Sequence, residues 1–114
     1  MESTRLQKVA RLLQKDMGDI FRLESRERYQ GAMITVTQVR VSPDLSVAKI
    51  YVSLFTLGQS KPELILELIK QDARYLRGKL GERIRHQLRV VPELIFHVDD
   101  TLDYVENIEN LLKK

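Results

Sequence analysis

The sequence predicts an α+β fold in which helices pack on one face of a three-stranded sheet. Two neighbouring segments, 33–41 and 47–57, are rich in strand-forming residues and are separated by a short turn, which indicates a hairpin. Segments with apolar residues at helical spacing precede and follow it, and a short alternating segment over 93–98 supplies a third strand. The expected order is helix, strand, strand, helix, helix, strand, helix, in one domain over residues 1–114.

The first helix is expected from Ser3 to about Arg26. Its apolar residues fall on one side of a helical wheel: Leu6, Val9, Ala10, Leu13, Met17, Ile20 and Phe21. Its basic residues fall on the other side: Arg5, Lys8, Arg11, Lys15 and Arg22. We therefore expect this helix to pack on the sheet and to present a basic back to solvent.

The hairpin follows a break at Tyr29-Gln30-Gly31. In the first strand the apolar alternation slips between Val36 and Val39, which predicts a bulge near Thr37-Gln38. A twisted strand that is buried on both faces would show the same pattern of residues. The turn over 42–46 contains proline and aspartate. The second strand alternates apolar and polar residues, with its inward side formed by Ala48, Ile50, Val52 and Leu54.

The next helical segment begins with a capping-box pattern, Ser60 and Glu63, and has Pro62 in its first turn. Continued to residue 88 it would be roughly 43 Å long, too long for a domain of this size, so it must be interrupted. Gly78 and Gly81 are two candidate positions, and 72–74 is a third.

The third strand starts after Pro92, with Leu94, Phe96 and Val98 alternating. A last helix is expected after the capping residues of 99–101, and its apolar residues are Leu102, Val105, Ile108, Leu111 and Leu112.

Charge is unevenly distributed along the chain, although the formal net charge is only +3. Residues 70–89 carry seven bases and two acids, whereas 90–114 carry two bases and six acids. On a helical wheel, three arginines cluster around two glycines on the face opposite the apolar stripe: Arg74, Gly78, Gly81, Arg85 and Arg89. This face predicts a surface that a nucleic-acid backbone can approach closely.

Enzymatic and metal-binding functions find little support. The chain has no cysteine, and His86 and His97 lack a neighbouring carboxylate cluster. Adjacent Asp99 and Asp100 are better explained as helix caps than as a metal pair. We expect no catalysis, metal or cofactor. There is no apolar signal core and no membrane-length apolar run, so we expect a soluble, cytoplasmic protein.

The tetrapeptide Gly78-Lys79-Leu80-Gly81 matches the GxxG loop with which K-homology (KH) domains clamp nucleotides. The surrounding order of elements resembles the bacterial type II KH arrangement. Residues 41–53, VSPDLSVAKIYVS, and residues 92–99, PELIFHVD, are similar to the hairpin and third-strand signatures of the bacterial ribosome-binding factor A family. Residues 5–10, RLQKVA, are similar to its N-terminal helix motif, so the resemblance covers nearly the whole chain.

The resemblance implies a KH type II-like domain that binds the free small (30S) ribosomal subunit and its 16S rRNA. It also implies assistance in late maturation and 5′-end processing of that rRNA, and a role in growth in the cold. In this family an Ala-x-Gly type kink interrupts the helix pair in place of a GxxG loop. The matching position here is Asp72-Ala73-Arg74, which lacks the glycine, and Gly78 is expected to take part of its role.

We predict a non-catalytic, monomeric RNA-binding protein without a membrane partner. The predicted RNA-binding residues are Arg5, Lys8, Arg11, Lys15, Lys70, Arg74, Arg77, Gly78, Lys79, Gly81, Arg85 and Arg89. Tyr75 has a ring suited to base stacking, but a tyrosine beside a kink is more often packed. Two alternatives remain open: a general single-stranded RNA-binding KH module, and a protein-interaction module that uses a sheet edge or the acidic tail.

Overall fold

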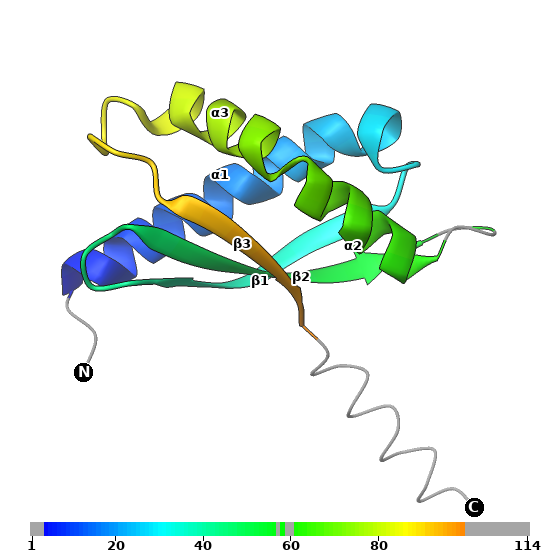
Figure 1. The fold of residues 1–114 in the computed structure, drawn as a ribbon, viewed down its shortest axis with the longest axis horizontal. Coiled ribbons are helices and arrows are strands. Elements are labelled where there is room, and N and C mark those ends of the chain that lie inside the picture. The colour runs from blue at the N-terminus through cyan, green and yellow to red at the C-terminus, as the bar shows by residue number, and fades with distance from the viewer. Residues whose placement is uncertain (1–3, 57, 59–60, 100–114) are drawn as a thin grey trace, which may run out of the picture.

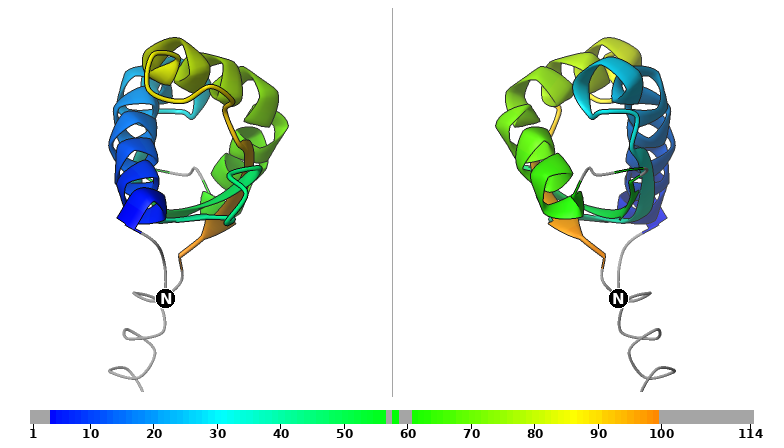
Figure 2. Two further views of the ribbon diagram at one scale, coloured as in Figure 1. Left: turned by 90° about the vertical axis from the view of Figure 1, so that its left-hand side faces the viewer. Right: turned by 90° about the vertical axis from the view of Figure 1, so that its right-hand side faces the viewer.

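The computed structural model describes residues 4–56, 58 and 61–99, and contains three helices and three strands within them (Figure 1). The order is α1 (Thr4–Arg28), β1 (Met33–Val41), β2 (Val47–Phe55), α2 (Pro62–Gln71), α3 (Ala73–Ile84) and β3 (Glu93–Val98). The helices lie together on one face of the sheet, as the end-on views of Figure 2 show. The predicted fold class is confirmed. The last helix predicted after residue 99 and the proposed cap Ser60 lie outside the described residues.

Helix α1 begins and ends close to its predicted bounds. Its buried residues are Val9, Leu13, Met17, Ile20, Phe21 and Ser25. The helix ends where Gln30 and Gly31 adopt left-handed backbone angles, with φ of 57° and 75°. The Gly31 amide then donates to the Ser25 carbonyl at 3.0 Å, which satisfies a carbonyl of the last turn.

Strands β1 and β2 form the predicted antiparallel hairpin. Val36 pairs with Val52 and Gln38 pairs with Tyr51, so Thr37 is the extra residue of a bulge, as predicted. Strand β3 then pairs with β2 in parallel, and the sheet order β1-β2-β3 leaves β1 at an edge.

A turn joins the hairpin strands, and Asp44 organises it. Its Oδ1 atom accepts hydrogen bonds from the Ser42 hydroxyl at 2.8 Å and from the Ser46 hydroxyl at 2.7 Å. The Ser46 amide donates to the same oxygen at 3.1 Å. These hydrogen bonds, that from the Ser46 hydroxyl most of all, lower the pKa of Asp44 to about 2.

The core lies between the helices and the sheet. Phe21 stands at its centre, with its ring 6.0 Å from those of Tyr29 and Phe96 in edge-to-face arrangements. The inward residues of α2, α3 and β3 complete it: Ile65, Ile69, Leu76, Leu80, Ile84, Leu94 and Phe96.

The bounds of the helix pair differ from those expected. Helix α2 begins at Pro62, and its N-cap residue Lys61 makes no side-chain cap hydrogen bond. Helix α3 ends at Ile84 rather than near residue 88, and the Gln87 and Leu88 amides both donate to the Ile84 carbonyl in a closing turn. The chain needs residues 85–92 to return from the top of α3 to the start of β3 (Figure 1).

Candidate nucleic-acid interface

The break between α2 and α3 falls at Asp72, one of the alternatives that the sequence left open. Asp72 has φ −90° and ψ 10°, and its amide donates to the carbonyls of Leu68 and Ile69 at 3.1 Å each. Its own carbonyl accepts from the Leu76 amide at 2.8 Å, which starts α3. A single residue therefore makes the kink, and no glycine is used.

Side chains from the end of α1 hold this kink. The Asp72 Oδ2 atom accepts a hydrogen bond from the Tyr29 hydroxyl at 3.0 Å and one from Arg28 at 3.1 Å. Burial first, and then the hydrogen bond to Asp72, raise the pKa of Tyr29 well above its ordinary value. The neutral hydroxyl is therefore the stable form, and it donates to the kink carboxylate.

Tyr75, considered above for base stacking, is already engaged. The Arg28 guanidinium lies 3.6 Å from the centre of its ring, and its hydroxyl donates to Glu24 at 3.1 Å. One ring face is covered and the hydroxyl is used, which favours the packing role.

The GxxG match does not form a loop, because Gly78 and Gly81 both lie inside α3. Their amides lie beyond the first turn of α3, where helical geometry pairs each with a carbonyl four residues earlier, so they do not point at a ligand. Gly78 is exposed, and a Cβ added there would meet nothing within 4 Å. A Cβ on Gly81 would lie 3.3 Å from a methyl group of Val91, so Gly81 allows close packing of the 85–92 segment.

Arg77 anchors the same segment. Its Nη2 donates to the Val91 carbonyl at 2.7 Å, and its Nε lies 3.2 Å from the carbonyls of Val91 and Pro92. The Nε and Nη2 groups of Arg77 thus donate to the backbone that leads into β3. Arg77 therefore shapes the surface in addition to carrying charge.

Four of the predicted cations line two neighbouring hollows. Arg74 and Arg77 line one hollow of about 530 Å³ between α3 and the start of β3, together with Glu93. Arg5 and Arg89 line a second, of similar volume, beside the hairpin turn. Both hollows are bounded by Ser46 and Val90, so they form one continuous surface from the kink side of α3 to the start of α1.

The other predicted cations lie away from these hollows. Lys70 is exposed in the last turn of α2, and Arg85 is exposed at the end of α3. Lys79 lies on the side of α3 that faces α1, with its Nζ 4.0 Å from a Glu82 carboxylate oxygen. Three more are exposed along α1: Lys8, Arg11 and Lys15.

Sequence analysis missed two arginines that organise the charges. Arg83 joins α3 to α1 through Asp16 and Asp19, each at 3.0 Å. Arg28 joins α1 to the kink, as described above. The Arg83 pairs turn Asp16 and Asp19 toward α3 and leave the exposed side of α1 predominantly basic. The wheel positions of the acids were visible in the sequence, but their partners lie more than forty residues away.

Other chemistry is sparse in the described residues. They contain no group of three histidine or acidic side chains arranged to hold a metal ion. His97 is stacked on Tyr51, with ring centres 5.4 Å apart on the open face of the sheet. No helix among the same residues is long and apolar enough to cross a membrane.

The topology, with a kinked helix pair between two parallel strands, is that of a KH-like fold. Comparison with known proteins makes the assignment specific. The family model for ribosome-binding factor A matches residues 5–112, and the chain belongs to that family.

Curated relatives agree with this assignment. The chain is 50% identical to the ribosome-binding factor A of Cytophaga hutchinsonii over 114 residues, covering all of this chain and 84% of the relative. It is 42% identical to that of Christiangramia forsetii over 98% of this chain and 85% of the relative.

Solved structures show the same fold. The crystal structure of ribosome-binding factor A from Thermus thermophilus matches with a TM-score of 0.65 at 24% identity, over 82% of this chain and 94% of that one. A Thermus thermophilus homology model fitted into the cryo-EM map of a complex with the 30S subunit matches with a TM-score of 0.59 at 27% identity, over 77% and 88%.

Proposed function

We propose that this protein is a ribosome assembly factor that binds the free 30S subunit through its 16S rRNA. It acts as a cytoplasmic monomer without catalysis, and it assists late maturation and 5′-end processing of that rRNA, including during growth in the cold. Membership of the ribosome-binding factor A family supports the first part, as does the 30S complex of the Thermus thermophilus relative. The processing and cold-adaptation roles rest on the family resemblance.

The observation that carries the proposal is the continuous basic surface beside the kink. Arg74 lies at one end of it and Arg5 and Arg89 at the other. No carboxylate of the described residues lies within 4.0 Å of these three guanidinium groups. A guanidinium group with no carboxylate partner among the described residues can bind two phosphate oxygens at once, and its binding releases counterions from the RNA.

The remaining predicted residues take different parts. Lys70 and Arg85 are exposed outside the two hollows and would add charge to the footprint, whereas Arg77 fixes the shape of the wall through the Val91 and Pro92 carbonyls. Gly78 leaves α3 without a side chain, and Gly81 lets α3 pack closely against Val91. Four lysines and arginines would extend the footprint where RNA reaches over the helices: Lys8, Arg11, Lys15 and Lys79.

Binding alone is sufficient for the proposed role. A factor that binds one rRNA conformation better than its alternatives shifts the population toward that conformation by its difference in affinity. A rigid, pre-shaped surface suits this task, because little binding energy is then lost to ordering the protein.

The test is cosedimentation of the purified protein with free 30S subunits across a salt series. The double variant Arg74→Glu, Arg89→Glu should bind much more weakly than the parent protein. The matched control is Arg40→Glu, Lys49→Glu, which makes the same charge change at a cross-strand pair of exposed side chains on the sheet. Circular dichroism checks that each variant is folded.

Equal loss of binding in both double variants would mean that net charge, and not this surface, determines affinity. Binding that is insensitive to salt and to both variants would favour the protein-interaction alternative. Sequence-selective binding of short single-stranded oligonucleotides, with no preference for the 30S subunit, would favour the general KH module.

A further inference from the structure

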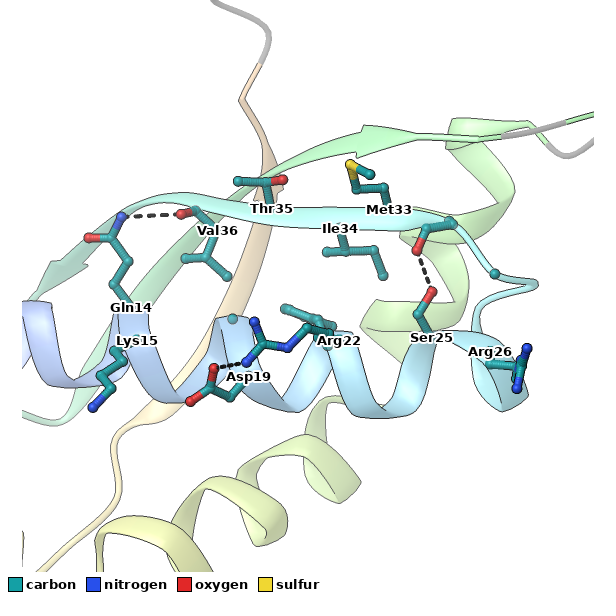
Figure 3. Close-up of a pocket in the computed structure, with 14 residues that line it drawn as sticks. Gln14, Lys15, Asp19, Arg22, Ser25, Arg26, Met33, Ile34, Thr35 and Val36 are labelled. Carbon is teal, nitrogen blue, oxygen red and sulfur yellow. Dashed lines mark hydrogen bonds and ion pairs between the residues drawn. The ribbon is translucent and has the colours of Figure 1, made fainter.

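A groove runs between α1 and the edge strand β1, on the side of the molecule that the sheet order leaves unpaired. It encloses about 770 Å³ and is drawn in Figure 3. Its lining comes from residues 14–26 of α1 and from residues 31–36, which include the start of β1, so it shares no residue with the two hollows of the proposed RNA surface.

The backbone of β1 is only partly satisfied by α1. The Ser25 hydroxyl donates to the Ala32 carbonyl, and the Gln14 side-chain amide donates to the Val36 carbonyl at 3.1 Å. Strand groups alternate sides with a period of two, so the N–H and C=O of Ile34 point to the same edge. In the described part of the chain, α1 supplies no side-chain hydrogen bond to Ile34. The N–H and C=O of Ile34 thus remain available between the hydrogen bonds that Ser25 and Gln14 donate to β1 and its leading residue Ala32.

The groove also has room for a side chain of a bound segment beside α1. Gly18 lines the groove from α1, and a Cβ added there would meet nothing within 4 Å. The walls beside it include the apolar residues Phe21 and Ile34. The space therefore suits an apolar side chain.

The rim of the groove is basic. Lys15, Arg22 and Arg26 line it at spacings of seven and four residues, which places them in one row along α1. Arg22 is paired with Asp19, which also pairs with Arg83. No carboxylate of the described residues lies within 4.0 Å of Lys15 or Arg26.

We propose that this groove binds an extended acidic segment of another protein by strand addition to β1. The segment exchanges main-chain hydrogen bonds with Ile34, places an apolar side chain beside Gly18, and directs carboxylates to the basic row. The free strand edge and the apolar walls favour a peptide over RNA, since a nucleic acid would need the cations alone. This activity goes beyond 30S binding and uses a groove that is separate from the two hollows, although Lys15 also belongs to the extended RNA footprint.

The probe is a short synthetic peptide that alternates glutamate with valine, titrated into the isotopically labelled full chain and followed by NMR. We expect saturable binding with the largest amide shifts at Gly18, Ile34 and Val36. A peptide with lysine in place of glutamate, and one with central prolines that lack N–H groups, should bind at least tenfold more weakly.

The decisive variant is Gly18→Leu, which places a side chain into the groove at a position where a Cβ meets nothing within 4 Å, and which replaces glycine with a better helix former. It should lose peptide binding by at least tenfold, keep or raise its melting temperature, and bind 30S subunits like the parent protein. Arg26→Glu should weaken the acidic peptide severalfold and leave 30S binding unchanged.

Four outcomes of these titrations, and a fifth with a further variant, would overturn the proposal. They are absence of saturable peptide binding, unchanged binding by Gly18→Leu, shifts that fall outside the groove, and binding of an RNA duplex there in preference to the peptide. Tighter peptide binding by the full chain after Asp103→Asn, Glu106→Gln and Glu109→Gln would also overturn it, because the chain's own acidic segment would then be the occupant.

Discussion

Removing one hydroxyl should show how much the kink depends on the end of α1. In Tyr29→Phe the fully buried ring keeps its packing against Phe21, while Asp72 loses the hydrogen bond of 3.0 Å. Hydrogen bonds to charged groups contribute about 1.5–3 kcal/mol. The Asp72 side chain is 24% exposed and keeps Arg28 as a partner, so the lower end applies and we expect a loss of about 1.5 kcal/mol.

Urea unfolding measures this change, because a lower midpoint at constant slope reports stability alone. The matched control is Tyr51→Phe, since within the part of the chain that the structure describes the Tyr51 hydroxyl makes no hydrogen bond. We expect a change below about 0.5 kcal/mol for this control. Equal effects of the two substitutions would refute the idea that Tyr29 secures the kink.

Three further predictions concern titration and backbone. Because the pKa of Tyr29 is raised on folding, the contribution of Tyr29 to stability should be constant below its ordinary pKa near 10, and stability should fall as pH rises above it. The urea midpoint of Tyr29→Phe should fall less over that range, and an identical pH profile would contradict this. The Asp44 carboxyl should titrate at about 2 by NMR, and stability should fall as pH drops from about 4 to 2. In Ser46→Ala the pKa of Asp44 should rise toward its ordinary value, and no rise would mean that the turn hydrogen bonds do not set it. Gly18→Ala should raise the unfolding free energy by about 1 kcal/mol, because Gly18 lies inside α1 and a Cβ there meets nothing within 4 Å. Gly31→Ala should lower the unfolding free energy, because the φ of Gly31 is +75°. Thermal unfolding measures both, and the opposite ranking would refute these backbone roles of the two glycines.

Much of the fold could be predicted because its signals are local. The slip in apolar alternation at Thr37 identified the bulge, and the apolar face of α1 matches its buried residues. Such patterns follow from the periods of strand and helix and need no knowledge of distant partners.

The kink and the roles of individual cations could not be resolved in this way. The two glycines of α3 were reasonable candidates by helix propensity, yet the break lies at Asp72, where Tyr29 and Arg28 converge from 43 and 44 residues away. Arg77 and Arg83 look equivalent to Arg74 in sequence. Arg77 donates to backbone carbonyls, whereas Arg83 pairs with acids of α1, and these partners are visible only in the tertiary structure.

This sorting of the cations sharpens the salt experiment on 30S binding. The sequence alone offers ten cationic candidates, which would give a slope of log affinity against log salt of about −8 if all met phosphates. Three of them line the two hollows and have no carboxylate of the described residues within 4.0 Å: Arg5, Arg74 and Arg89. If RNA contacts these three cations alone, the slope should be about −2.5. A slope near −5 would mean that Lys8, Arg11 and Lys15 also meet phosphates, so that RNA wraps around α1, and the groove beside β1 would then lie next to bound RNA.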